Sequence, residues 1–134
     1  MRVLPRREGF TLIELMIVIV IIGILAMIAV SLFWRVKDRG IQASMQADLK
    51  NAAAQQEIYY SSYLAYAPTA MYLASYNTSP GVSLTVTYSG PDGWAGVVTH
   101  ASVPAAQCGL AVNSAPIASA PPALQSGIVA CTGL

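Results

Sequence analysis

The chain opens with a long apolar run that passes into an amphipathic pattern, and no proline interrupts either part. The 25 residues from Phe10 to Trp34 include Glu14 as their one charged residue. At about 1.5 Å per residue this run makes a helix of roughly 37 Å, enough to cross a bilayer core of about 30 Å. From Arg35 onward, apolar residues recur at intervals of three and four, the period of a helix with one apolar face. The pattern predicts one continuous helix to about Ser62.

The pattern changes to alternation in the second half of the chain, where a small sheet is expected. Apolar and hydroxyl side chains alternate over 82–88, turn residues follow at 90–93, and 94–101 can return as the partner strand. Shorter apolar stretches at 108–112 and 127–131 are read as further strands, separated by a polar loop with three prolines. The predicted fold class is therefore α+β, with a long N-terminal helix packed on a small antiparallel β-sheet.

Charge is scarce and unevenly placed. The chain has seven basic and six acidic residues, and Asp92 is the one Asp, Glu, Lys or Arg after Glu57. Basic residues flank the apolar run almost equally, so the positive-inside rule does not orient it. The neutral distal half offers no basic footprint for nucleic acid, so the tyrosines near the helix end are interpreted as core and helix-exit packing. These are Tyr59, Tyr60, Tyr63 and Tyr66.

The two cysteines, Cys108 and Cys131, both lie in the distal half and lack metal-ligand spacing with His100, the one histidine. They suit a disulfide in an oxidising compartment, which would place the distal part outside the cytoplasm. Two buried free thiols are the alternative. No catalytic constellation or phosphate-binding motif occurs, since His100 has no acidic neighbour at a useful spacing. No enzyme activity, metal or cofactor is predicted.

Glu14 is unusual, because a carboxylate inside a membrane span costs roughly 2.5 to 3.5 kcal/mol on insertion scales. No basic residue lies three or four positions away, the nearest being Arg7 and Arg35. Glu14 either snorkels to interfacial water or has a partner outside the chain. We favour the outside partner.

The residues Arg-Glu-Gly-Phe-Thr-Leu-Ile-Glu-Leu at 7–15, followed by the apolar run and the continuous helix, resemble the class III signal of type IV pilins and type II secretion pseudopilins. The resemblance implies that a prepilin peptidase cuts between Gly9 and Phe10 and that Phe10 becomes N-methylated. It further implies that Glu14 pairs with the Phe10 amine of a neighbouring subunit. Phe10, Thr11 and Glu14 are thus the expected assembly residues.

Residues 6–30 carry this resemblance most closely, and the remainder matches only in architecture. Gly23 corresponds to a helix-weakening glycine of many pilins, whereas Ser31 stands where a helix-kinking proline often follows. The distal cysteine pair is similar to the pilin disulfide loop. The domains expected are a cleaved leader (1–9), a transmembrane and assembly helix (10–34), an amphipathic helix (35–62) and a sheet domain with a disulfide-bounded loop (63–134).

The function implied is a structural subunit of a type IV pilus, polymerised through its N-terminal helix. A secretion pseudopilin, or a minor pilin that binds a ligand or DNA, is the alternative. Expected partners are other copies of the chain, other pilins, the prepilin peptidase, the inner-membrane assembly platform and membrane lipid, while nucleic acid is not supported. The precursor is expected in the inner membrane as a single-pass protein with its N-terminus in the cytoplasm, and the product in a surface pilus or periplasmic pseudopilus.

An ordinary secretory signal is the competing interpretation. Leu15–Ile28 would be its apolar region and Ala29-Val30-Ser31 its cleavage site. It predicts a freely secreted domain, but leaves Glu14 and the helix beyond Ser31 unexplained.

Overall fold

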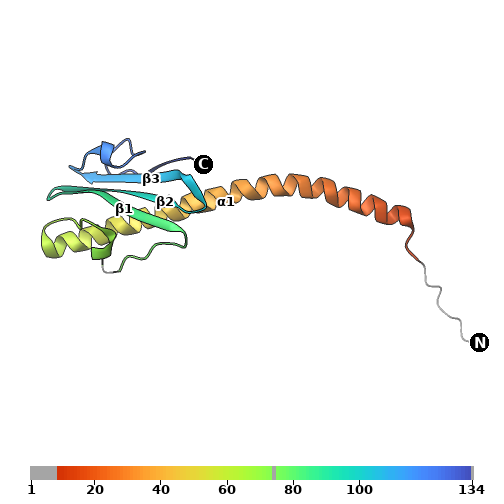
Figure 1. Ribbon diagram of the computed structural model, residues 1–134, viewed down its shortest axis with the longest axis horizontal. Helices are drawn as coiled ribbons and strands as arrows, with labels where there is room; N and C mark the ends of the chain where they lie inside the picture. The colour runs from red at the N-terminus through yellow and green to blue at the C-terminus, as the bar shows by residue number, and fades with distance from the viewer. Residues whose placement is uncertain (1–8, 74, 134) are drawn as a thin grey trace, which may run out of the picture. The chain divides into compact units, whose positions relative to one another are not determined.

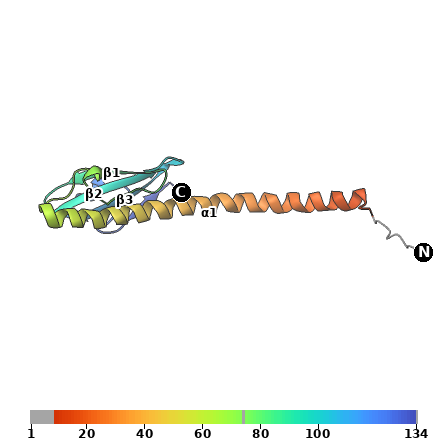
Figure 2. The same ribbon diagram turned by 90° about the horizontal axis from the view of Figure 1, so that it is seen from below.

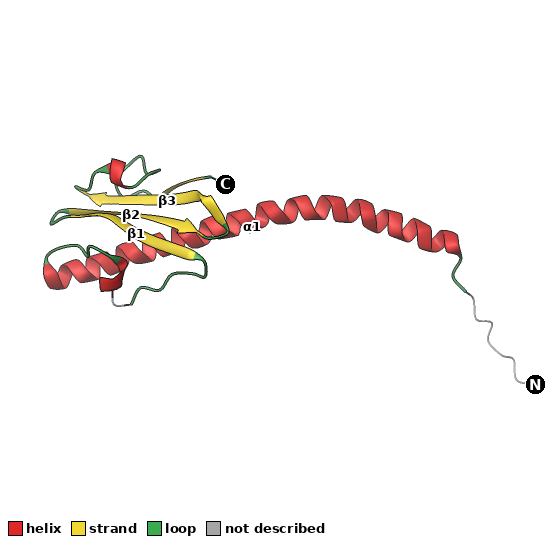
Figure 3. Cartoon of the chain, viewed as in Figure 1, coloured by secondary structure: helices red, strands yellow, loops and turns green. Residues whose placement is uncertain are grey.

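The computed structural model describes residues 9–73 and 75–133 (Figure 3). The predicted leader over 1–9 therefore lies, apart from Gly9, outside the described residues. The chain divides into two compact units, Met1–Lys37 and Asp38–Leu134, which are treated separately below. The described elements are α1 (Leu12–Tyr63), the short 3₁₀ helices η1 (Ala70–Tyr72) and η2 (Ile117–Ser119), and the strands β1 (Val82–Ser89), β2 (Gly93–His100), β3 (Val103–Asn113) and β4 (Ala130–Thr132).

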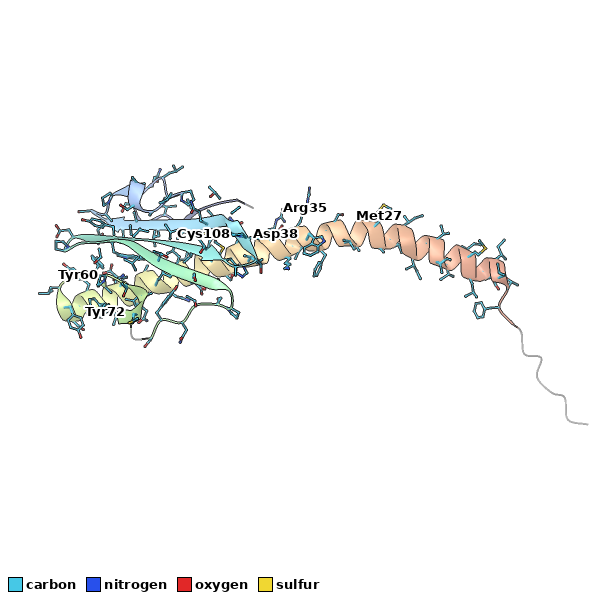
Figure 4. The ribbon with its side chains drawn as sticks, in the orientation of Figure 1. Met27, Arg35, Asp38, Tyr60, Tyr72 and Cys108 are labelled. Carbon is cyan, nitrogen blue, oxygen red and sulfur yellow. A yellow bond between two sulfur atoms is a disulfide. The ribbon has the colours of Figure 1, made fainter. Side chains whose placement is uncertain are left out.

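The first unit holds the N-terminal part of α1, where every described side chain from Gly9 to Lys37 is exposed. Figure 4 shows side chains projecting from this segment of α1, including Met27. Its large apolar side chains are exposed, for example Ile19 at 65% and Leu25 at 60%. Among the described residues, α1 is the one helix long and apolar enough to cross a membrane. A helix that is apolar all round is normally covered by lipid or by other helices.

In the second unit the rest of α1 is amphipathic, as predicted, and its apolar face packs on the sheet (Figures 1 and 2). Its buried residues share one side of the helix because they follow the spacing of three and four. They are Met45, Asp48, Leu49, Ala52 and Gln56. The helix ends at Tyr63, close to the predicted Ser62, and Leu64 follows with a φ of 53°. That left-handed conformation ends the helix.

The four described strands form an antiparallel sheet in chain order, β1-β2-β3-β4. One row of register partners crosses the whole sheet, from Leu84 to Val98, then Cys108, then Cys131. Val98 and Cys108 belong to the core between the sheet and α1, and Leu84 and Cys131 pack against that core. The predicted α+β class is confirmed, and so is the hairpin of β1 and β2.

The two later strands differ from the prediction. β3 begins at Val103, five residues before the expected start, because Pro104 and Gln107 interrupt the apolar pattern there. β4 begins at Ala130 and not at 127. Gly127 has a φ of 78° and its N–H donates to the Ala111 carbonyl, so the chain there turns back over β3 before it pairs.

A second layer covers the face of the sheet opposite α1, at the blue end of the chain in Figure 1. The loop between β3 and β4 was expected to be a polar connection, yet it folds over the sheet and buries a cluster of small side chains. These are Ala95, Ala111, Ala115, Ala120 and Ala123. A methyl group on Gly109 would collide with the carbonyl oxygens of Ala120 and Pro121, so the close approach of this loop depends on that glycine.

The tyrosines near the end of α1 divide between core and surface. Tyr66 is buried, with Tyr60 stacked on it at 4.8 Å between ring centroids, and Tyr59 packs against the same core. Tyr63 stacks on Tyr59 but is 68% exposed. Tyr66 thus belongs to the core, as expected, whereas Tyr63 packs at the helix exit by stacking on Tyr59 and is not part of the core. Figure 4 shows Tyr60 and Tyr72 at this end of the helix.

Candidate processing and assembly site

Thr11 and Glu14 form reciprocal hydrogen bonds at the first turn of α1. The Thr11 backbone N–H and its hydroxyl both donate to Oε2 of Glu14, each at 2.8 Å. In return the Glu14 N–H donates to the Thr11 hydroxyl oxygen at 3.3 Å. This reciprocal pattern is a capping box, in which a threonine at the helix start and a glutamate three residues later satisfy backbone N–H groups that have no helical partner.

Glu14 thus has a hydrogen-bond partner within its own chain, in addition to the outside partner expected from the sequence, which stays a prediction. The sequence signal for this contact is Thr-x-x-Glu before an apolar run, which is a capping motif. All three hydrogen bonds with Thr11 leave Oε1 of the exposed Glu14 side chain accessible to a further donor. Thr11, expected only as an assembly residue, is thus the group that orients this carboxylate.

Gly9 and Phe10 precede the helix, which begins at Leu12. Both are exposed, and the Phe10 side chain is 82% exposed. Their peptide bond therefore lies in accessible backbone outside the helix. A protease can bind such a segment and cut it. A methyl group added to Gly9 would meet no described atom within 4 Å. The fold of this chain consequently places no demand for glycine at position 9.

Gly23 lies within unbroken helix, with open space around the position that a side chain would take. Ser31 is helical as well, and its hydroxyl donates to the Ile28 carbonyl at 2.9 Å. The role of Gly23 as a point of helix weakness stays a prediction.

At the other end of the chain, the predicted disulfide between Cys108 and Cys131 is confirmed, with an S–S distance of 1.98 Å. The two residues face each other directly on β3 and β4. Gln46 on α1 approaches this bond, its amide nitrogen lying 3.5 Å from the Cys131 sulfur. Among the described residues, no three His, Cys, Asp or Glu side chains gather in a group that could hold a metal ion.

Two comparisons with known proteins bear on the N-terminal site. Residues 4–30 match the family described as "Prokaryotic N-terminal methylation motif". The chain is 47% identical over 57 residues to the "Type IV major pilin protein PilA" of Myxococcus xanthus, covering 42% of this chain and 26% of that protein. It is also 54% identical over 54 residues to the "Type IV narrow pilus major component PilA5" of Thermus thermophilus, covering 40% of this chain and 44% of that one.

Part of this chain is homologous to type IV major pilins. The matched methylation motif contains Gly9, Phe10, Thr11, Glu14 and Gly23, so it includes every residue expected at the N-terminal site. The match covers about a quarter of the Myxococcus xanthus protein and less than half of the Thermus thermophilus protein. Each match covers less than half of this chain.

Proposed function

We propose that this chain is the structural subunit of a type IV pilus, made as a precursor, cut between Gly9 and Phe10 by a prepilin peptidase and polymerised through its N-terminal helix. The observation that carries the proposal is the methylation motif over residues 4–30, found in a chain with two relatives named as major pilins. These names favour a pilus over a secretion pseudopilus. The motif also favours cleavage at Gly9 over cleavage at Ser31 by an ordinary signal peptidase.

The exposed apolar surface of residues 10–36 supplies the driving force for assembly. Water around such side chains is unfavourable by roughly 25 cal/mol per Å² of apolar surface. Lipid covers these side chains while the precursor waits in the membrane, and neighbouring copies of the same helix cover them in the filament. The distal domain, with its Cys108–Cys131 disulfide, suits the oxidising side of the inner membrane. The N-terminus then lies in the cytoplasm.

Glu14 links processing to assembly. The amine of Phe10 forms only when the leader is removed, and it is a cation that can pair with a carboxylate. Thr11 holds Glu14 through Oε2, which leaves Oε1 for the Phe10 amine of a neighbouring subunit. Within a bundle of apolar helices an unpaired charge is strongly unfavourable, so such a pair fixes which neighbours fit together. The partners of this pathway are the prepilin peptidase, the inner-membrane assembly platform and other pilins.

The mass of the mature chain and its presence in filaments test the proposal. Intact mass spectrometry of the chain in sheared surface filaments should show loss of residues 1–9 and the addition of one methyl group. Loss of residues 1–31, or absence of the chain from the filaments, would contradict it. Gly9→Ala should leave an uncleaved precursor with an unchanged fold, because the site has open space.

Two substitutions at Glu14 separate its capping role from its charge. Glu14→Gln retains a side-chain oxygen for Thr11 but removes the charge, and Glu14→Ala removes both. We expect both variants to be inserted and cleaved normally and both to lose filaments, because the neighbour's amine has lost its anion. Filaments of normal yield from Glu14→Gln would show that capping, and not ion pairing, is what assembly requires.

A further inference from the structure

We propose that the C-terminal end of the apolar segment binds the headgroup of an anionic phospholipid, with Arg35 and Lys37 as the charged contacts and Trp34 as the interfacial ring. This inference rests on the membrane stage of the proposed function and goes beyond it, because it names a lipid class that the waiting precursor prefers.

The first support is the depth at which the charged groups lie. Lys37 reaches back along the helix, so that its ammonium nitrogen lies 5.0 Å from the centre of the Trp34 ring. Side chains on a helix lean toward its N-terminus, which brings the cation to the level of the tryptophan. From Leu12 to Trp34 the helix rises roughly 33 Å, slightly more than a bilayer core. Trp34 therefore reaches the headgroup region, where tryptophan is enriched in membrane proteins.

The second support is a hollow on the helix surface that joins apolar side chains to a cation. It has a volume of about 370 Å³ and is lined by Ile28, Ser31, Leu32 and Arg35. The Ser31 hydroxyl is already bonded to the Ile28 carbonyl, which leaves Arg35 as the donor for a ligand. Ile28 and Leu32 are 63% and 61% exposed and can lie along an acyl chain. The Arg35 guanidinium can then hold a phosphate through two hydrogen bonds.

Charge complementarity identifies the ligand. No acidic residue occurs from Leu15 to Lys37, and the segment 35–39 has three basic residues against one acidic residue. Each Lys or Arg near an anionic membrane surface contributes about 1 kcal/mol of attraction, which corresponds to a factor of about five in binding. A neutral headgroup lacks that gain. Phosphatidylglycerol and similar lipids would therefore gather around the waiting subunit and oppose its extraction into a filament.

The test uses the full precursor in vesicles of phosphatidylcholine alone or mixed with phosphatidylglycerol, each with a trace of spin-labelled lipid. The fraction of motionally restricted label reports which headgroup the protein holds. We expect a preference for phosphatidylglycerol of roughly 25-fold, falling to about onefold in the Arg35→Gln/Lys37→Gln variant. Lys50→Gln, which removes one exposed charge from the second unit, should keep the preference.

The other outcomes separate the inference from its foundation. Equal restriction of both labelled lipids by an inserted wild-type chain would overturn the lipid site, as would an unchanged preference in the double variant. Added inorganic phosphate should leave the preference for phosphatidylglycerol intact. Loss of that preference when phosphate is added would mean that the ligand is a free anion, and would overturn the lipid site. Failure of the wild-type chain to enter either vesicle would overturn the membrane stage of the proposed function and the lipid site with it. Arg35 and Lys37 are exposed, so formation of the distal disulfide in each variant serves as the folding control.

Discussion

The side chain of Gln56 and the backbone of Ala67 exchange two hydrogen bonds in the interior of the sheet domain. The Gln56 amide nitrogen donates to the Ala67 carbonyl at 3.1 Å, and the Ala67 N–H donates to the Gln56 side-chain oxygen at 2.8 Å. Both residues are fully buried. Gln56 therefore acts as an extra backbone segment that fixes the chain where it leaves α1. Asp48, also on α1, fixes a later segment of the chain: its carboxylate accepts hydrogen bonds from the N–H and the hydroxyl of Ser79.

Gln56→Ala should destabilise the domain by about 2 to 4 kcal/mol, because it leaves a buried N–H and a buried carbonyl without partners. Denaturant unfolding of the full chain in detergent micelles measures this, in a Trp34→Phe background so that the buried Trp94 is the fluorescent reporter. Gln55→Ala makes the same chemical change at a half-buried neighbour whose amide has no hydrogen bond among the described residues, and it should cost well under 1 kcal/mol. Equal losses for the two variants would contradict the pairing of Gln56 with Ala67.

Gly109→Ala tests the packing on the sheet of the loop between β3 and β4 (residues 114–129), which is called the outer loop below. The added methyl would lie against the carbonyl oxygens of Ala120 and Pro121, the latter at 2.6 Å, and backbone atoms cannot rotate away. We expect a loss of about 3 kcal/mol, at the upper end for overpacked sites. Gly40→Ala is the control, since that glycine is helical and has open space around it. It should stabilise α1 by about 1 kcal/mol, so the two variants should shift the thermal midpoint in opposite directions.

Periodicity was enough to predict the parts of this fold that bury large side chains. The apolar face of α1 and the alternation in β1 have clear periods, and the helix and hairpin follow them. The alanine cluster under the outer loop could not be foreseen in this way. Ala95, Ala111 and Ala120 carry small side chains that occur in helices, strands and loops alike. The prolines in the loop around Ala120 predict only an irregular connection between strands.

At the N-terminal site, the motif identified the residues but not their mutual contacts. Helical spacing places no basic residue beside Glu14. The hydroxyl and N–H of Thr11 satisfy it instead. A capping interaction depends on the precise start of the helix, which at Leu12 is set by local hydrogen bonds and not by hydrophobicity.

Removal of the disulfide should loosen the outer loop more than the helix-facing core. Cys108 and Cys131 are 23 residues apart in sequence, and closing a loop of that size contributes about 3 kcal/mol in the chain-entropy model. In Cys108→Ala/Cys131→Ala, hydrogen exchange should therefore accelerate most in peptides from residues 114–129, whereas peptides from residues 45–56 of α1 should change less. Reduction of the wild-type protein should give the same pattern. Unchanged exchange in the loop would show that its alanine contacts hold it without the bond.

Stability at alkaline pH should depend on Tyr76. Its hydroxyl is buried and has no hydrogen-bond partner among the described residues. Burial, followed by the negative charge of Asp48, raises the pKa of Tyr76 from 10.0 to about 12. Because the folded-state pKa exceeds the unfolded value, the stabilisation from keeping this side chain neutral is complete below about pH 10 and is lost as the pH rises toward 12. Tyr76→Phe should thus make the unfolding free energy fall less steeply over that window. At pH 7 it should raise the unfolding free energy by about 1 to 3 kcal/mol, because a buried hydroxyl without a partner carries a desolvation penalty. Denaturant unfolding at a series of pH values measures both effects.

Tyr63→Phe, at a 68% exposed position, is the control for Tyr76→Phe and should keep the wild-type pH dependence. Some slope should persist in Tyr76→Phe, since burial and the neighbouring Glu57 also raise the pKa of Tyr66, but a slope equal to that of the wild type would rule out Tyr76 as a source.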